Sequence, residues 1–195
     1  MSKNSSARTL TAPASQAWGA RNLAYCALLA ALSIVFARLI IPMPNETTRF
    51  SIEAVPIFLA GLFFGPVAGG LIGFIGHTLI DLSWGGSPWW SWVIASTFVG
   101  IVVGLFAKKL NVNEGEFSKK DVVTYAIANV IAHVVAWIGV APVLDILIYA
   151  EPVDKVFAQG AMAAVANILT AVIVGALLIA AYTKTIAKKG SLEKQ

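Results

Sequence analysis

The chain has 195 residues, of which 58% are hydrophobic and 12% are charged, and its mean hydropathy is +0.79. Soluble domains carry about twice that charged fraction, so the composition excludes an ordinary soluble domain and indicates a one-domain integral membrane protein. The net charge of +4 is spread over short segments between apolar stretches, which argues against a nucleic-acid partner, and the single cysteine excludes an internal disulfide.

Both ends of the chain are polar. Residues 1–19 are rich in Ser, Ala and Thr, and their pattern is not that of a signal peptide because the apolar run begins too late. We expect residues 1–19 to form a disordered cytoplasmic tail and residues 188–195 to form a second cytoplasmic tail. The membrane domain is therefore expected at residues 20–187.

The first apolar segment carries small residues on one helical face. Ala20, Ala24, Ala27 and Ala31 are spaced by four, three and four residues. Such stripes let two helices approach closely. This stripe either packs within the protein or docks onto another membrane subunit.

The second apolar block, Ile52–Leu82, is longer than the about 20 residues that one helix needs to cross a bilayer. Gly65-Pro66 lies near its centre, where glycine ends a helix readily and proline cannot donate to the preceding turn. We therefore split this block in two. The sequence predicts six transmembrane helices, at about 22–41, 52–64, 66–82, 89–107, 121–141 and 157–183.

Basic residues favour six spans over five. Six spans place Lys108, Lys109, Lys119 and Lys120 on the cytoplasmic side, whereas five would place them outside, against the positive-inside rule. The fold expected is thus an all-α integral membrane bundle of six helices with both termini in the cytoplasm. The loops expected outside are 42–51, 83–88 and 141–155.

A histidine and an aspartate lie near the end of the third predicted helix. His77 and Asp81 are four residues apart, so they share one helix face. Ionisable groups at membrane depth are costly and are functional candidates. The pair could bind a ligand, with Asp81 orienting His77, or it could be a structural contact between helices. A metal site is disfavoured, because no third ligand follows at a metal-like spacing and there is no cysteine cluster.

Four tryptophans follow within nine residues: Trp84, Trp89, Trp90 and Trp92. Such a cluster could form an aromatic belt at the membrane interface or the wall of a pocket for a flat ligand. Adjacent residues on a helix point about 100° apart, so Trp89 and Trp90 cannot both face the same surroundings. We expect at least one tryptophan to face a pocket and at least one to face lipid headgroups.

Polar residues of other segments complete the candidate binding site. Asn129, His133 and Trp137 form one stripe on the fifth predicted helix, which either lines the pocket or joins helices structurally. Asn167 of the sixth helix is expected to face this stripe. Arg49 and Asp145, from the first and last outer loops, are the remaining candidates.

Several motifs of active transporters and enzymes are absent. The chain has no Walker-A motif, no G-x-S-x-G elbow and no H-E-x-x-H pair, so we expect no energy source and no catalytic residues. It also has no obvious inverted repeat of the kind found in many secondary transporters. Two other functions stay open: a self-contained permease or channel, and an intramembrane enzyme that uses His77 and Asp81, or His133.

The six short spans, the Ala27-x-x-x-Ala31 motif and the Phe64-Gly65-Pro66 turn together resemble one family over nearly all of residues 20–190. This family comprises the substrate-binding S components of energy-coupling factor (ECF) vitamin transporters. The segments 73–77, 86–92 and 144–152 look like a subgroup labelled the ECF-type riboflavin transporter S component.

The resemblance implies a substrate-binding subunit of an ATP-binding cassette importer in a prokaryotic plasma membrane. Such a subunit captures riboflavin, or another vitamin or precursor, from outside, with residues 42–51 as a gate. It then topples in the lipid against a transmembrane coupling subunit, the T component, driven by two ATPases. Ala24, Ala27 and Ala31 would lie at the coupling interface. The resemblance implies no cofactor, and the chain lacks the Met-His start of nickel and cobalt members.

Overall fold

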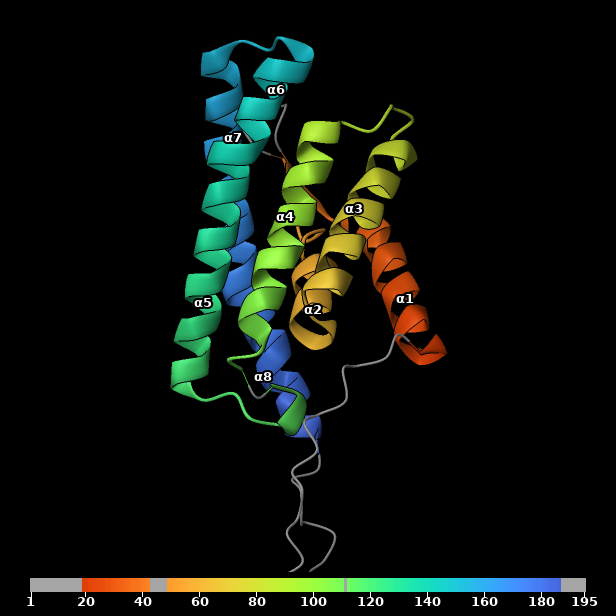
Figure 1. The fold of residues 1–195 in the computed structure, drawn as a ribbon, viewed down its shortest axis with the longest axis vertical. Coiled ribbons are helices and arrows are strands. Elements are labelled where there is room, and N and C mark those ends of the chain that lie inside the picture. The colour runs from red at the N-terminus through yellow and green to blue at the C-terminus, as the bar shows by residue number, and fades with distance from the viewer. Residues whose placement is uncertain (1–18, 43–48, 111, 187–195) are drawn as a thin grey trace, which may run out of the picture.

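The computed structural model describes residues 19–42, 49–110 and 112–186. The expected tails, 1–19 and 188–195, lie almost entirely outside these ranges. Helices run up and down side by side and make up nearly all of the described chain (Figure 1). The first four helices are α1 (Ala20–Phe36), α2 (Val55–Phe64), α3 (Pro66–Ser83) and α4 (Trp90–Ala107).

Two long helices with π-helical turns follow a short 3-10 turn (Val112–Glu114). In the first long helix, α5 (Lys119–Val134) continues through a π turn (Val135–Val140) into α6 (Ala141–Tyr149). In the second, α7 (Val153–Leu169) continues through a π turn (Thr170–Gly175) into α8 (Ala176–Thr185).

Four helical stretches of the described chain are long and apolar enough to cross a membrane: Pro66–Ser83, Trp90–Ala107, Lys119–Tyr149 and Val153–Thr185. Two shorter apolar helices, Asn22–Phe36 and Val55–Phe64, accompany them. The described fold is thus helical throughout, apart from a small antiparallel ribbon of β1 (Ile40–Pro42) and β2 (Arg49–Ser51), in which Ile41 faces Phe50.

The break between α2 and α3 lies where the sequence predicts it. Gly65 adopts a φ of 88°, which favours glycine, and Pro66 begins α3. α5 begins equally clearly, at a capping box in which the Ser118 and Asp121 side chains each accept from the other residue's backbone N–H.

The predicted boundaries of the last two helices are wrong. The fifth helix does not end at residue 141 but continues to Tyr149, and the sixth begins at Val153 rather than 157. Pro142 follows the π turn, where the backbone already departs from α-type pairing, so its missing N–H does not break the helix. The chain turns instead at Ala150, which is left-handed (φ 54°), and at Pro152, which cannot continue the helix.

Backbone contact joins α3 to α4. A Cβ atom added at Gly69 would lie 2.2 Å from the Gly100 carbonyl oxygen, and one added at Gly73 would lie 2.4 Å from the Ser96 carbonyl oxygen. Only glycine fits such an approach. The contact brings His77, one turn beyond Gly73, next to Ser96.

The end of α4, the start of α5 and the end of α8 lie at the same end of the bundle (Figure 1). Five exposed lysines belong to these segments. The positive-inside rule predicts that this end faces the cytoplasm. The lysines concerned are Lys108, Lys109, Lys119, Lys120 and Lys184.

Candidate functional site

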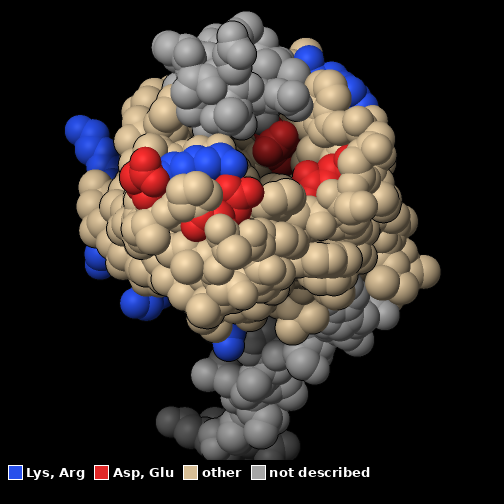
Figure 2. Space-filling view, turned by 90° about the horizontal axis from the view of Figure 1, so that it is seen from above, with Lys and Arg blue, Asp and Glu red and all other residues tan. Residues whose placement is uncertain are grey.

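A cavity of about 260 Å³ opens at the opposite end of the bundle, between the α3–α4 loop and the start of α7. Acidic and basic side chains gather around a hollow on this face (Figure 2). Eight described residues line the cavity: His77, Asp81, Trp89, Trp92, Asp145, Glu151, Lys155 and Gln159.

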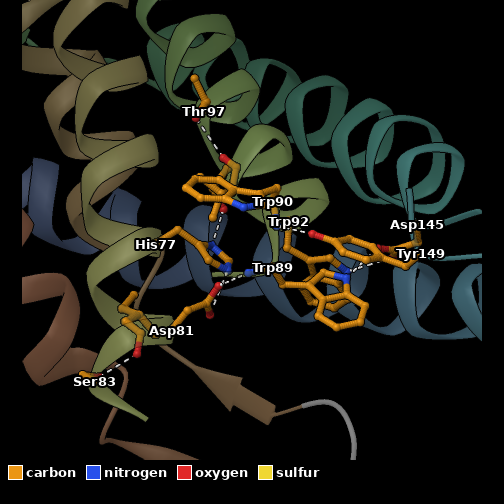
Figure 3. A network of polar contacts seen from close by, with 12 residues as sticks. His77, Asp81, Ser83, Trp89, Trp90, Trp92, Thr97, Asp145 and Tyr149 are labelled. Atoms are coloured by element: carbon orange, nitrogen blue, oxygen red, sulfur yellow. Dashed lines mark hydrogen bonds and ion pairs between the residues drawn. The ribbon is translucent and has the colours of Figure 1, made fainter. Parts of the chain in front are cut away.

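The Asp145 carboxylate of α6 joins that helix to the start of α4 (Figure 3). Its Oδ1 accepts hydrogen bonds from the Trp89 Nε1–H, at 2.6 Å, and from the Ser91 hydroxyl. Its Oδ2 accepts from the Trp92 Nε1–H at 3.0 Å. Asp145 is only 3% exposed, so these three hydrogen bonds replace the ones that water would otherwise donate to the carboxylate. They also fix both indole rings at the cavity wall.

Asp81 joins the end of α3 to the same region. Its Oδ2 accepts from the backbone N–H of Trp89 at 2.8 Å, and its Oδ1 lies 3.7 Å from His77 Nε2. His77 Nδ1 lies 2.6 Å from the Ser96 hydroxyl oxygen. Contacts at both ring nitrogens therefore hold the imidazole at the cavity wall (Figure 3).

Aromatic rings support the wall from behind. The Trp89 indole stacks on the Tyr149 ring with centroids 4.2 Å apart, and the Tyr149 hydroxyl accepts from the backbone N–H of Trp90 at 2.9 Å. The Trp92 indole tilts against Trp137, with centroids 5.1 Å apart. The site thus combines rigid aromatic surfaces with carboxylates, an imidazole and an amide.

The structure brings five of the residues that the sequence predicts for the site to the cavity lining, from α3, α4 and α6. Asp81 and His77 share a helix face, as their spacing indicates, and Trp89 and Trp92 approach from the next helix. The five residues are His77, Asp81, Trp89, Trp92 and Asp145.

Two of the predicted tryptophans lie outside the lining. The Arg38 guanidinium lies 3.7 Å above the Trp84 ring, and its Nη2 donates to the Ser83 carbonyl at 2.6 Å. The Trp90 ring stacks on Phe74 with centroids 6.1 Å apart. Both indoles are about two-fifths exposed, as expected of residues at a membrane interface.

The predicted stripe on the fifth helix lies behind the cavity wall. Asn129 Nδ2 donates to the Tyr125 carbonyl at 2.9 Å, and Trp137 Nε1 donates to His133 Nδ1 at 3.0 Å. The Asn129 Oδ1 and His133 Nε2 atoms are buried without a hydrogen-bond partner among the described residues. Trp137 connects this stripe to the lining through its contact with Trp92.

Two further predicted site residues, Asn167 and Arg49, are not among the described residues that line the cavity. The Asn167 side chain is half-buried and donates to the Ala163 carbonyl at 2.9 Å within its own helix. Arg49 belongs to β2, but its side chain and most of the expected gate, residues 43–48, lie outside the described part of the structure.

Sequence reasoning missed three lining residues: Glu151, Lys155 and Gln159. Glu151 Oε2 accepts from Lys155 Nζ at 2.6 Å. Lys155 and Gln159 are four residues apart, which is a signal for one helix face, whereas Glu151 lies in the turn before α7. This signal was hidden because the sixth helix was expected to begin at residue 157.

The alanine face of α1 lies on the surface of the described molecule. Ala24, Ala27 and Ala31 are exposed, whereas Cys26 and Ala30 are buried against α2 and α3. The face therefore does not pack inside the described bundle, so it is available to a second membrane protein or to lipid.

Within residues 19–42, 49–110 and 112–186, no three His, Cys, Asp or Glu side chains come together as a set that could hold a metal ion. The eight described lining residues include no Ser or Cys. Chemically, the arrangement suits reversible binding of a small molecule by stacking and hydrogen bonding.

Known proteins share the sequence and the fold. A family model described as "ECF-type riboflavin transporter, S component" matches residues 18–184. A UPF0397 protein of Streptococcus gordonii is 46% identical over 165 residues, covering 85% of this chain and 89% of that protein. A UPF0397 protein of Enterococcus faecalis is 45% identical over 166 residues, covering 84% of this chain and 90% of that protein.

Among solved structures, the crystal structure of FolT bound with folic acid resembles the fold with a TM-score of 0.61. The match covers 85% of this chain and 95% of FolT, at 18% sequence identity. The likeness at this identity concerns the helical architecture.

Proposed function

Because the chain belongs to the family of ECF-type riboflavin transporter S components, we propose that it captures riboflavin, or another vitamin or precursor, from outside the cell. The family is one of transport subunits, not of catalysts, and its members are multi-pass membrane proteins. For this chain, we propose the class of substrate, the side of the membrane from which the substrate enters, and the coupling partners.

The observation that carries the proposal is the aromatic-walled cavity at the end of the bundle opposite the five exposed lysines of α4, α5 and α8. Small-molecule sites combine apolar and aromatic walls with a few fixed polar groups. Each well-placed aromatic pair contributes about 0.5–1.5 kcal/mol beyond the burial of its area. A volume of about 260 Å³ is just below the roughly 300–1,000 Å³ of typical pockets, which favours a compact ligand.

We further propose that the protein delivers its ligand by toppling against a T component driven by two ATP-binding cassette ATPases. The exposed alanine face of α1 supports this, because small side chains let a partner helix approach closely. Both termini are proposed to lie in the cytoplasm, on the side of the exposed lysines.

The experiment is to purify the full-length protein, extract any small molecule that it retains, and identify that molecule by mass spectrometry. After removal, the same molecule should rebind and quench tryptophan fluorescence, because Trp89 and Trp92 line the cavity. Protein that retains no small molecule, and shows no quenching with a panel of vitamins and precursors, would contradict the proposal.

A further inference from the structure

The lining of the cavity is acidic. Asp81, Asp145 and Glu151 face it, and Lys155 is the single basic lining side chain in the described part of the chain. Three carboxylates against one ammonium leave a net charge of −2 when His77 is neutral. Adding Arg49, which the sequence predicts for the site, would still leave an excess of carboxylates.

The charge of Asp145 is not neutralised by a cation. Its three hydrogen-bond donors, two indole N–H groups and one hydroxyl, are all neutral. They occupy three of the acceptor positions of the carboxylate but bring no positive charge to it. No ion pair to Asp145 forms among the described residues. A buried charge without an opposite charge is costly, so a cation placed in the cavity would be stabilised here.

The one ammonium of the lining is already paired. Lys155 Nζ lies 2.6 Å from Glu151 Oε2, so its charge is largely offset within the pair. When His77 is neutral, an anionic ligand would therefore meet Asp81 and Asp145 without a matching cation among the described side chains.

The aromatic walls favour the same class of ligand. Indole faces attract cations through the ring quadrupole, most strongly where water is excluded. Trp89 and Trp92 line the cavity and are held in place by Asp145. Because the described residues offer no set of three metal-ligating side chains, the cation that fits is organic rather than a metal ion.

We propose that the ligand of this cavity is an organic cation, either a positively charged heteroaromatic ring or a ring that carries a protonated amine. This inference rests on the proposed function, because it names the class of molecule that the same cavity captures. The charged group lies between Asp81 and Asp145, and the ring lies against the indoles of Trp89 and Trp92.

Charge-matched probe pairs test the inference on the purified full-length protein after removal of any retained ligand. The pairs are pyridoxamine with pyridoxine and 1-methylnicotinamide with nicotinamide, and the panel adds riboflavin as a neutral ligand and folic acid as an anion. Tryptophan fluorescence and thermal stability report binding. We expect at least one cation to bind at least about tenfold more tightly than its neutral partner.

The outcomes separate the inference from the function on which it rests. Tighter binding of riboflavin or folic acid than of every cation would overturn the cationic class and leave ligand capture standing. Failure of the whole panel to bind would count against both.

Two variants of lining residues should shift the affinity for cations in opposite directions. Glu151→Gln removes a carboxylate and releases Lys155 from its pair, so it should weaken cation binding, whereas Lys155→Gln should strengthen it. At low salt we expect the dissociation constant of the cation to rise about three- to tenfold in Glu151→Gln and to fall by a similar factor in Lys155→Gln. The two side chains are 20% and 48% exposed, so the fold should tolerate both changes.

The matched control is Asp154→Asn, because Asp154 is exposed and outside the lining. It should leave cation affinity nearly unchanged. Shifts of the same sign in Glu151→Gln and Lys155→Gln, or no shift in either, would overturn the proposal.

Discussion

Asp145 is the residue on which the geometry of the site depends most. Its carboxylate orients two indoles and one hydroxyl from the first turn of α4. A single side chain thus links the shape of the aromatic wall to its charge.

Asp145→Asn is predicted to weaken both folding and ligand binding. The amide keeps one acceptor and gains N–H groups where donors already point, which leaves at least one buried donor unpaired. The free energy of unfolding should fall by about 1–3 kcal/mol, as measured by thermal and denaturant unfolding in detergent. Asp154→Asn is the control and should unfold like the wild type. An unchanged stability of Asp145→Asn would contradict the hydrogen-bond network described.

At the scale of elements, the contact between α3 and α4 places the cavity residues. The Gly100 carbonyl lies so close to Gly69 that neither position has room for a Cβ atom. Because this contact sets the spacing of the two helices, it also sets the approach of His77 to Ser96. The binding site therefore depends on glycines well away from it.

Gly100→Ala is predicted to be destabilising, because its Cβ would lie 2.0 Å from the Gly69 carbonyl oxygen. Forcing the helices apart should cost about 1–3 kcal/mol of unfolding free energy and should weaken ligand binding. Gly139→Ala is the matched control, since nothing lies within 4 Å of the added Cβ. Equal stability of the two variants would show that α3 and α4 are not in backbone contact.

The alanine face of α1 makes a separate prediction. Ala27→Trp and Ala31→Trp should leave ligand binding intact and abolish uptake by cells that contain the coupling module, because both positions are exposed and a bulky ring blocks close helix approach. Val165→Trp, at a 60% exposed position of α7, should transport normally. Loss of ligand binding in the α1 variants would mean that this face packs internally.

The sequence predicts much of this architecture because its signals are local. Gly65-Pro66 marks the α2–α3 break, and the spacing of His77 and Asp81 places both on one face. The end of α6 is not predictable in the same way, because a π turn offsets the effect of Pro142. The predicted start of the sixth helix at residue 157 left Lys155 outside it, whereas Lys155 and Gln159 both lie on α7, which begins at Val153, and both line the cavity.

The tryptophans show a second limit of the sequence. Adjacency predicts that Trp89 and Trp90 face different surroundings, but it does not say which one faces the cavity. The choice depends on Asp145, which lies 56 residues from Trp89 in the chain and accepts its indole N–H. A contact between such distant segments has no local sequence signal.

At the scale of the whole molecule, the bundle has two chemically distinct ends. One carries five exposed lysines, and the other carries the aromatic-walled cavity, in which three carboxylates outnumber Lys155. Between them lie helices whose outer side chains are large and apolar, such as Leu147 and Leu177, which are 74% and 67% exposed. This difference between the two ends suits a subunit that binds its ligand on one side of a membrane and contacts a partner subunit within the membrane.

The central claim is that the cavity captures a small molecule, and blocking the cavity tests it most directly. Gln159 lines the cavity from α7, whereas Ala161 is exposed on the same helix. The measurement is the molar ratio of retained small molecule to purified protein, by mass spectrometry, in the wild type, Gln159→Trp and Ala161→Trp. We predict near-equimolar ligand in the wild type and in Ala161→Trp, and almost none in Gln159→Trp. Retention by Gln159→Trp equal to that of the wild type would contradict the account.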